Sequence, residues 1–179
     1  MKVRLFDIPA EGLSIVAKAD DRWFGNLIQV AFQEDYRKGS PASLELYLLN
    51  TCENISITGT AEIDLSPSCD RCLETFAQHL TIPLQVNLAP APDIDRDEDG
   101  ASATPEEDIN FSFYHGDEFD LGAIVREMIL LEVPIKYLCT DTCKGLCPRC
   151  GQNLNLATCS CTPHPADPRL AVLKKLLKG

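Results

Sequence analysis

Eight of the nine cysteines in this chain fall in closely spaced pairs, and this spacing constrains the structure more than any other feature of the sequence. The pairs are Cys69-x-x-Cys72, Cys139-x-x-x-Cys143, Cys147-x-x-Cys150 and Cys159-x-Cys161. Two thiolates two or three residues apart can bind one tetrahedral ion from a tight turn, and a second pair completes four sulfur ligands. The eight cysteines therefore predict two zinc ions. Each would be structural, because four sulfurs leave no open coordination position.

The sequence favours one pairing of these motifs without fixing it. The last two pairs would form a local site, because the eight residues between them can fold back over one ion. The first two pairs would then tie the strands to the segment that follows the long helix. The alternatives exchange the pairs, leave one site without metal, or replace one sulfur by His164.

Two cysteine motifs have local features that bear on their chemistry. Leu146–Gly151 (LCPRCG) is typical of a zinc knuckle, whose turn aims backbone N–H groups at the sulfurs and whose glycine permits a left-handed closing residue. Cys69-Asp70-Arg71-Cys72 could instead be a redox pair. Thioredoxin-like chemistry needs the first cysteine at a helix N-terminus, whereas this pair lies between two predicted strands. Cys52 stands outside the pairs and is expected to be a small buried hydrophobe.

Alternating apolar and polar residues dominate the first ninety positions. The alternation is clear over 55–65 and 80–88, and two weaker strands are predicted over 24–32 and 43–49. A short strand is predicted near 109–114. The strongest helix begins after Asp120 as N-cap, places Leu121, Val125 and Ile129 on one face, and ends at Pro134. A terminal helix is predicted after Asp167.

These elements predict an α+β fold with four parts. Residues 1–90 would form an antiparallel sheet or small barrel, and 91–108 an acidic linker or loop. Residues 109–138 would add a strand and one long helix packed on the sheet, and 139–179 a zinc-knuckle segment with the terminal helix. Nothing in the sequence indicates a leader peptide or a membrane span, so a cytoplasmic protein is expected.

Negative charge is concentrated in the middle of the chain. Residues 93–120 hold eleven acidic residues and one basic residue, a net charge of −10, whereas the whole sequence has a net charge of −11. Asp95, Asp97, Asp99 and Glu106 match the spacing of a calcium-binding EF-hand loop. Prolines stand where the flanking helices should be, so a solvated acidic linker is the favoured interpretation and a calcium site the alternative.

The sequence contains none of the motifs that would indicate catalysis. It has no P-loop, no dinucleotide-binding glycines, no His-Glu-x-x-His and no nucleophile elbow. The sequence therefore predicts a protein that is not an enzyme.

Several blocks resemble the YceD family of bacterial and plastid proteins, described as large ribosomal RNA subunit accumulation proteins. They are the segment 69–73 (CDRCL), the helix 120–132 with its Val-Pro ending, the block 139–155 (CTDTCKGLCPRCGQNLN), Cys159-x-Cys161 and Asp167-Pro168-Arg169. The resemblance implies a non-enzymatic role in the accumulation of large-subunit ribosomal RNA.

Two hypotheses of different classes follow. In the first, the chain is an assembly or processing adaptor that binds a basic ribosomal or rRNA-processing protein through Asp95, Asp97, Asp99, Glu106 and Glu107. In the second, it is a zinc module that binds large-subunit rRNA precursor directly. The phosphate-binding residues would then be Lys144, Arg149, Arg169, Lys174 and Lys175. The net charge favours the first, because an acidic protein repels phosphate. Redox chemistry at Cys69 and Cys72 is the third alternative.

Overall fold

The computed structural model describes residues 1–51, 54–91 and 111–161. Their main element is a mixed sheet with strand order β2-β3-β4-β5-β6. Its strands are β2 (Leu13–Lys18), β3 (Ala42–Asn50), β4 (Ile55–Leu65), β5 (Gln78–Pro90) and β6 (Phe111–Tyr114). The first four strands pair antiparallel, and β6 pairs parallel to β5. β1 (Lys2–Arg4) and β7 (Glu118–Asp120) form a separate antiparallel pair.

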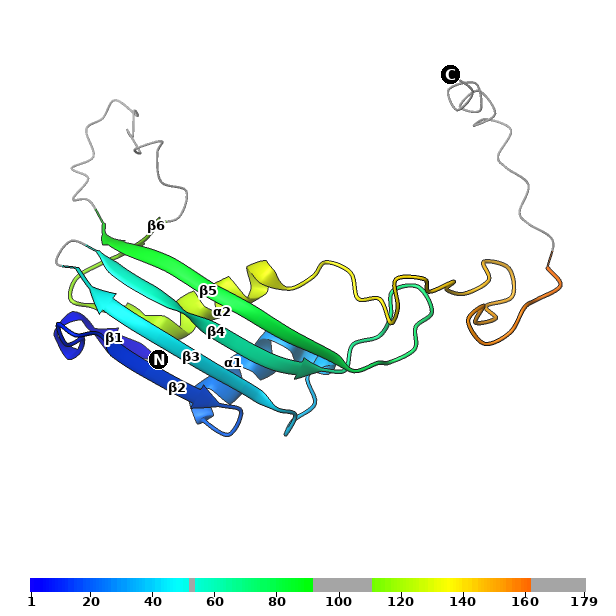
Figure 1. The fold of residues 1–179 in the computed structure, drawn as a ribbon, viewed down its shortest axis with the longest axis horizontal. Coiled ribbons are helices and arrows are strands. Elements are labelled where there is room, and N and C mark those ends of the chain that lie inside the picture. The colour runs from blue at the N-terminus through cyan, green and yellow to red at the C-terminus, as the bar shows by residue number, and fades with distance from the viewer. Residues whose placement is uncertain (52–53, 92–110, 162–179) are drawn as a thin grey trace, which may run out of the picture.

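Two α-helices of the described chain, α1 (Arg22–Phe32) and α2 (Leu121–Glu132), contact each other and cover the same face of the sheet (Figure 1). The alternation along each strand sends one set of side chains to the helices and the other to the opposite face. The core between these layers includes Leu44, Leu48, Ile57, Ile63 and Leu84, all at most 2% exposed. On the opposite face, side chains such as Thr58, Thr60 and Glu62 are exposed. The sheet is therefore half-buried, as antiparallel sheets commonly are.

The predicted α+β class is confirmed, as are the strands over 43–49, 55–65 and 80–88. The helix after Asp120 is also confirmed, with the Asp120 side chain accepting a hydrogen bond from the Ala123 backbone N–H at 3.3 Å. Val133 and Pro134 follow its last turn. An N-cap carboxylate of this kind satisfies one of the free N–H groups of the first turn.

The predicted strand over 24–32 is wrong, because this segment is helix α1. Its buried residues are Phe24, Leu27, Ile28 and Phe32, which are spaced as one face of a helix. A short, largely apolar run is ambiguous by periodicity alone, and packing against the sheet decides its structure. The prediction that one long helix packs on the sheet is therefore also wrong, because α1 and α2 both do.

The strands that residues 1–90 contribute to the sheet, β2 to β5, pair antiparallel as predicted. The sheet is open, which is the first of the two predicted alternatives and not the small barrel, since β2 and β6 each pair with one neighbour. The added strand β6 runs parallel to β5 along the pairs from Asn87–Phe111 to Pro90–Tyr114, an orientation that the sequence did not predict. Among the described residues, no helix is both long enough and apolar enough to cross a membrane.

Candidate metal centre

The first pair of cysteines lies in the loop that joins β4 to β5. Within this loop the Leu73 backbone N–H donates to the Cys69 carbonyl at 2.8 Å, and the Cys69 N–H donates to the Glu74 carbonyl at 2.9 Å. Ser68 and Thr75 form a β-bridge at its base. Leu73 has a positive φ of 63°. The loop is thus a tight turn that buries the side chains of Cys69 and Cys72.

The predicted zinc knuckle around Cys147 has the same local structure. The Gly151 N–H donates to the Cys147 carbonyl at 2.9 Å, and the Cys147 N–H donates to the Gln152 carbonyl at 2.8 Å. Leu146 and Asn153 form the β-bridge, and Gly151 has a φ of 73°. Both Cys-x-x-Cys loops are therefore knuckles, although in the first a leucine occupies the left-handed position. Cys69 does not begin a helix, which disfavours the redox interpretation.

The chain after α2 reaches the first knuckle through a reciprocal pair of hydrogen bonds. The Tyr137 N–H donates to the Asp70 carboxylate at 2.7 Å, and the Asp70 N–H donates to the Tyr137 carbonyl at 2.9 Å. Figure 1 shows both segments beyond the same end of the sheet. This contact brings Cys139 and Cys143 to the sulfurs of Cys69 and Cys72.

The four sulfurs of this first group are spaced as ligands of one ion. The Sγ atoms of Cys69 and Cys143 are 3.8 Å apart, and those of Cys72 and Cys139 are 3.7 Å apart. A tetrahedral zinc ion with Zn–S bonds of about 2.3 Å places its sulfurs about 3.8 Å apart. Disulfide sulfurs lie about 2.05 Å apart, so none of these cysteines is bridged. We call this group, Cys69, Cys72, Cys139 and Cys143, the N-terminal centre.

The second group consists of Cys147, Cys150, Cys159 and Cys161, which we call the C-terminal centre. Within each group, all four ligand atoms lie within 4.8 Å of one another. The two groups follow the pairing that the sequence favours rather than the exchanged one. Cys150 is exposed, and Cys159 and Cys161 are half-buried, whereas three of the four thiols in the N-terminal centre are buried.

Each centre contains a thiol whose pKa hydrogen bonds lower and another whose pKa burial or a neighbouring sulfur raises. Backbone hydrogen bonding at Cys139 lowers the pKa of Cys69 to about 6, and backbone hydrogen bonding at Cys150 lowers that of Cys147 to about 6. Burial raises the pKa of Cys139 to about 12, and the sulfur of Cys150 helps to raise that of Cys161 to about 12. Neighbouring thiolates repel, so four thiols at this spacing can all ionise only around a cation.

Asn155 contacts the N-terminal centre, a position that the cysteine spacing does not reveal. Its side-chain N–H donates to the Sγ atom of Cys143 at 3.2 Å and thereby lowers the pKa of that thiol. A hydrogen bond to a ligating sulfur stabilises its charged form and orients it toward the ion. An asparagine four residues beyond the predicted turn that ends at Gly151 gives no periodic signal, so only the folded chain identifies it.

A close backbone contact joins the two knuckles. The Leu146 N–H donates to the Arg71 carbonyl at 3.0 Å, and the Arg71 guanidinium donates to the Cys143 carbonyl at 3.0 Å. Gly145 has a φ of 72°, and a Cβ atom there would lie 2.9 Å from the Arg71 carbonyl oxygen. Glycine is thus required at position 145 by both backbone conformation and space.

Gly145→Ala and Gly151→Ala form a matched pair that tests this contact. Gly151 also has a positive φ, yet a Cβ atom there meets nothing within 4 Å. Gly151→Ala should therefore carry only the left-handed penalty, about 1–2 kcal/mol. Gly145→Ala should lower the free energy of unfolding further, by about 1 kcal/mol or more, because it also separates Leu146 from Arg71. Urea unfolding measures both, and equal losses would show that the contact contributes nothing.

The other predicted binding residues are only partly described. Lys144 and Arg149 are exposed beside the cysteines, and the Lys144 N–H donates to the Asn155 side-chain oxygen at 2.8 Å. Other predicted residues lie outside the described residues: Cys52, Asp95, Asp97, Asp99, Glu106, Glu107, His164, Arg169, Lys174 and Lys175. The terminal helix and the calcium-type spacing fall there as well.

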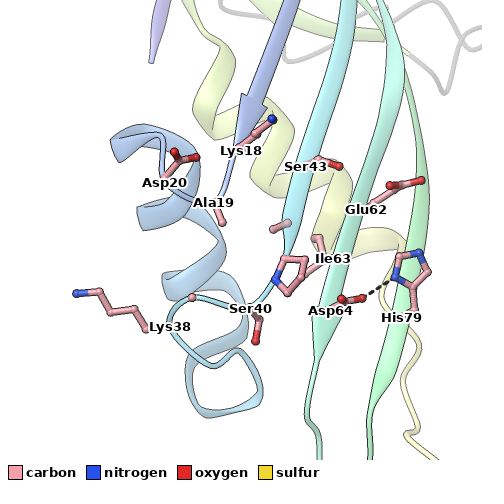
Figure 2. Close-up of a pocket in the computed structure, with 13 residues that line it drawn as sticks. Lys18, Ala19, Asp20, Lys38, Ser40, Ser43, Glu62, Ile63, Asp64 and His79 are labelled. Atoms are coloured by element: carbon pink, nitrogen blue, oxygen red, sulfur yellow. Dashed lines mark hydrogen bonds and ion pairs between the residues drawn. The ribbon is translucent and has the colours of Figure 1, made fainter.

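A hollow of about 560 Å³ lies at the C-terminal end of β2, near the loop that precedes β3. Figure 2 shows Lys18, Ser43 and Glu62 on adjacent strands at its rim, with the Asp64 carboxylate paired to the His79 ring at 2.6 Å. The lining carries both basic side chains, Lys18 and Lys38, and acidic ones, Asp20, Glu62 and Asp64. The hollow therefore has no concentrated charge of the kind that selects a polyanion, and the cysteine groups remain the candidate site.

Residues 57–177 match the family model described as "Large ribosomal RNA subunit accumulation protein YceD". The match covers about two thirds of the chain and includes both cysteine centres. The chain belongs to the YceD family. The description names accumulation of ribosomal RNA and no catalysed reaction.

Similar YceD-family proteins occur in plants. The chloroplastic "Large ribosomal RNA subunit accumulation protein YCED homolog 1" of Arabidopsis thaliana is 24% identical over 154 residues, covering 75% of this chain and 48% of that protein. The Zea mays homolog 1 is 31% identical over 145 residues, covering 69% and 49%. An uncharacterized protein of Mycobacterium tuberculosis is 30% identical over 141 residues, covering 78% and 64%. The chain thus spans about half the length of its plant relatives. No solved structure is significantly similar to it.

Proposed function

We propose that this chain is a non-enzymatic factor in the accumulation of large-subunit ribosomal RNA, acting as a zinc-stabilised adaptor for a basic protein partner. Membership of the YceD family, through a match that includes both cysteine centres, is the observation that carries this proposal. The family description supplies the process, and the geometry and charge of the chain suggest how it takes part.

Each cysteine centre is proposed to hold one structural zinc ion. The sulfur spacing of 3.7–3.8 Å in the N-terminal centre suits a tetrahedral ion, and four thiolates leave no position for substrate. Asn155 and the backbone N–H groups of the knuckles supply the outer hydrogen bonds that zinc–thiolate sites use. Because thiols stay reduced in the cytoplasm, that compartment suits the proposal.

A basic protein is the partner that the charge of the chain favours. The net charge is −11, and two zinc ions each held by four thiolates would bring it to about −15. Such a molecule attracts cationic surfaces and repels the phosphate backbone. The acidic residues 93–108 offer the densest charge in the sequence for a basic ribosomal or rRNA-processing protein.

Direct binding of rRNA is the second candidate, favoured by one observation. Lys144 and Arg149 are exposed on the cysteine-bearing segment, where a knuckle would hold them rigidly. Zinc knuckles are among the small modules that bind single-stranded RNA. The two candidates predict opposite effects of the same substitutions.

Neutralising Asp95, Asp97, Asp99, Glu106 and Glu107 to the corresponding amides should weaken association with large-subunit precursors on the order of tenfold. The salt dependence should become shallower, because fewer opposite charges meet across the interface. Lys144→Ala with Arg149→Ala is the matched surface control and should change little. Co-sedimentation with purified precursors at several salt concentrations, with and without ribonuclease, measures both.

If RNA is instead the direct partner, the pattern reverses. The lysine and arginine substitutions would then weaken binding to purified RNA for all sequences, and neutralising the acids would strengthen it by removing repulsion. That result would replace the adaptor proposal with the RNA-binding one.

A further inference from the structure

Asn155 physically joins the two cysteine centres. It lies in the loop between Cys150 and Cys159, whose sulfurs belong to the C-terminal centre, but its side chain contacts the N-terminal centre. Its Nδ2 atom is 3.2 Å from the Sγ atom of Cys143, and its Oδ1 atom accepts from the Lys144 N–H at 2.8 Å.

The hydrogen bonds of the Asn155 amide to Lys144 and Cys143 fix its orientation. A backbone N–H can only donate, so the side-chain oxygen must face Lys144. The side-chain nitrogen is then left to donate to the sulfur of Cys143, which can accept. An amide rotated by 180°, with its oxygen and nitrogen exchanged, would lose both hydrogen bonds. The contacts of the loop therefore direct an N–H donor at the Cys143 sulfur.

The position of Asn155 depends on the fold of its own loop. The Asn153 side-chain oxygen accepts from the Asn155 backbone N–H and from the Asn155 side chain, both at 3.0 Å. The Leu154 N–H donates to the Gly145 carbonyl at 2.9 Å, and the Ala157 N–H donates to the Asn153 carbonyl at 3.1 Å. This loop closes over the C-terminal centre, so an ion there would order the residues that carry Asn155.

We propose that Asn155 makes metal binding at the two centres cooperative. An ion in the C-terminal centre orders the loop, the ordered loop directs the Asn155 N–H at Cys143, and the hydrogen bond strengthens the N-terminal centre. Coupling of this kind is reciprocal, so an ion in the N-terminal centre strengthens the C-terminal centre by the same factor. The inference rests on the proposed binding of one metal ion at each centre.

The test uses the full chain loaded with cadmium-113, for which each four-sulfur centre gives its own NMR resonance. The Cys69→Ser, Cys72→Ser variant assigns the two resonances, and competition with a chelator gives an affinity for each centre. Asn155→Ala should lower the affinity of the N-terminal centre about tenfold, the usual effect of losing a hydrogen bond to a metal ligand. Gln152→Ala is the matched control, because it removes an amide from the same loop that does not contact sulfur.

Two further variants separate coupling from a general loss of loop structure. Asn155→Asp keeps an oxygen acceptor for Lys144 but loses the donor, so it should weaken the N-terminal centre at least as much as Asn155→Ala. Cys147→Ser with Cys150→Ser should also lower the metal affinity of the N-terminal centre about tenfold. Adding Asn155→Ala to this variant should lower that affinity no further, because both changes remove the same contact, the hydrogen bond from Asn155 to Cys143.

Two outcomes would overturn the coupling while leaving metal binding intact. In the first, the losses of affinity from the cysteine and Asn155 substitutions add. In the second, Asn155→Ala leaves the affinity of the N-terminal centre within twofold of wild type. A wild-type chain that binds no cadmium at either centre would overturn both the coupling and the proposed zinc sites. The two failures are therefore distinguishable.

Discussion

Replacing Cys69 and Cys72 by serine is expected to reduce the metal content of the purified chain from two ions to one. The substitution removes two of the four sulfurs of the N-terminal centre, while the four of the C-terminal centre stay within 4.8 Å of one another. Structural zinc binds such sites with roughly 10–16 kcal/mol, so losing half the ligands should empty the centre. Elemental analysis of the chain purified without chelator measures the result.

The same variant should keep its sheet. The core of β3, β4 and β5 with the two helices contains neither of these sulfurs, because Cys69 and Cys72 belong with Cys143 to a separate cluster. Hydrogen exchange should therefore increase in 69–76 and 137–146 and stay slow in β4. Cys52→Ser is the matched control, since Cys52 belongs to no pair, and it should retain two ions. Two ions in the double variant would contradict the assignment of these ligands.

Phe24→Ala should lower the free energy of unfolding by about 3–5 kcal/mol. The Phe24 ring is 0% exposed where α1 packs on the sheet, and its removal leaves a cavity that the surrounding side chains can only partly fill. Phe6→Ala is the control, because Phe6 is 71% exposed and the Arg4 guanidinium lies over its ring, 5.6 Å from the ring centroid. Its loss should be within about 1 kcal/mol.

Urea unfolding of the two phenylalanine variants measures this difference. Equal losses would mean that α1 contributes no more to the core than the N-terminal segment does. The comparison also tests the element that the sequence did not identify, since only a helix buries Phe24, Leu27, Ile28 and Phe32 together.

The strands over 55–65 and 80–88 could be predicted because polar and apolar residues alternate along a half-buried sheet, and this alternation is a local property of the sequence. Helix α1 could not be assigned, since its apolar run fits two structures and only its packing on the sheet decides between them. The parallel pairing of β6 depends on contacts between Asn87–Pro90 and Phe111–Tyr114, which no local pattern encodes.

The cysteine centres show the same division. Spacing alone predicted two groups of four sulfurs, because paired thiolates in tight turns have few other uses. The knuckle around Cys147 could be predicted because Gly151 is a typical left-handed residue. The equivalent knuckle around Cys69 could not, because the left-handed residue there is Leu73, with a φ of 63°. Asn155 was missed because its contact with Cys143 forms only when two separate loops meet.

The separation in sequence of the sulfurs in each centre gives their ions different effects on the unfolded chain. Cys69 and Cys143 are 74 positions apart, so an ion that joins them closes a long loop, while the C-terminal centre closes a loop of about fifteen residues. By the loop-entropy relation for cross-links, these closures restrict the unfolded ensemble by roughly 4 and 3 kcal/mol respectively. If each centre holds the proposed ion, the C-terminal loop can therefore form around its ion early, whereas the N-terminal centre must await β4, β5 and α2. The ion proposed for the N-terminal centre would then act as a late cross-link between the two halves of the fold.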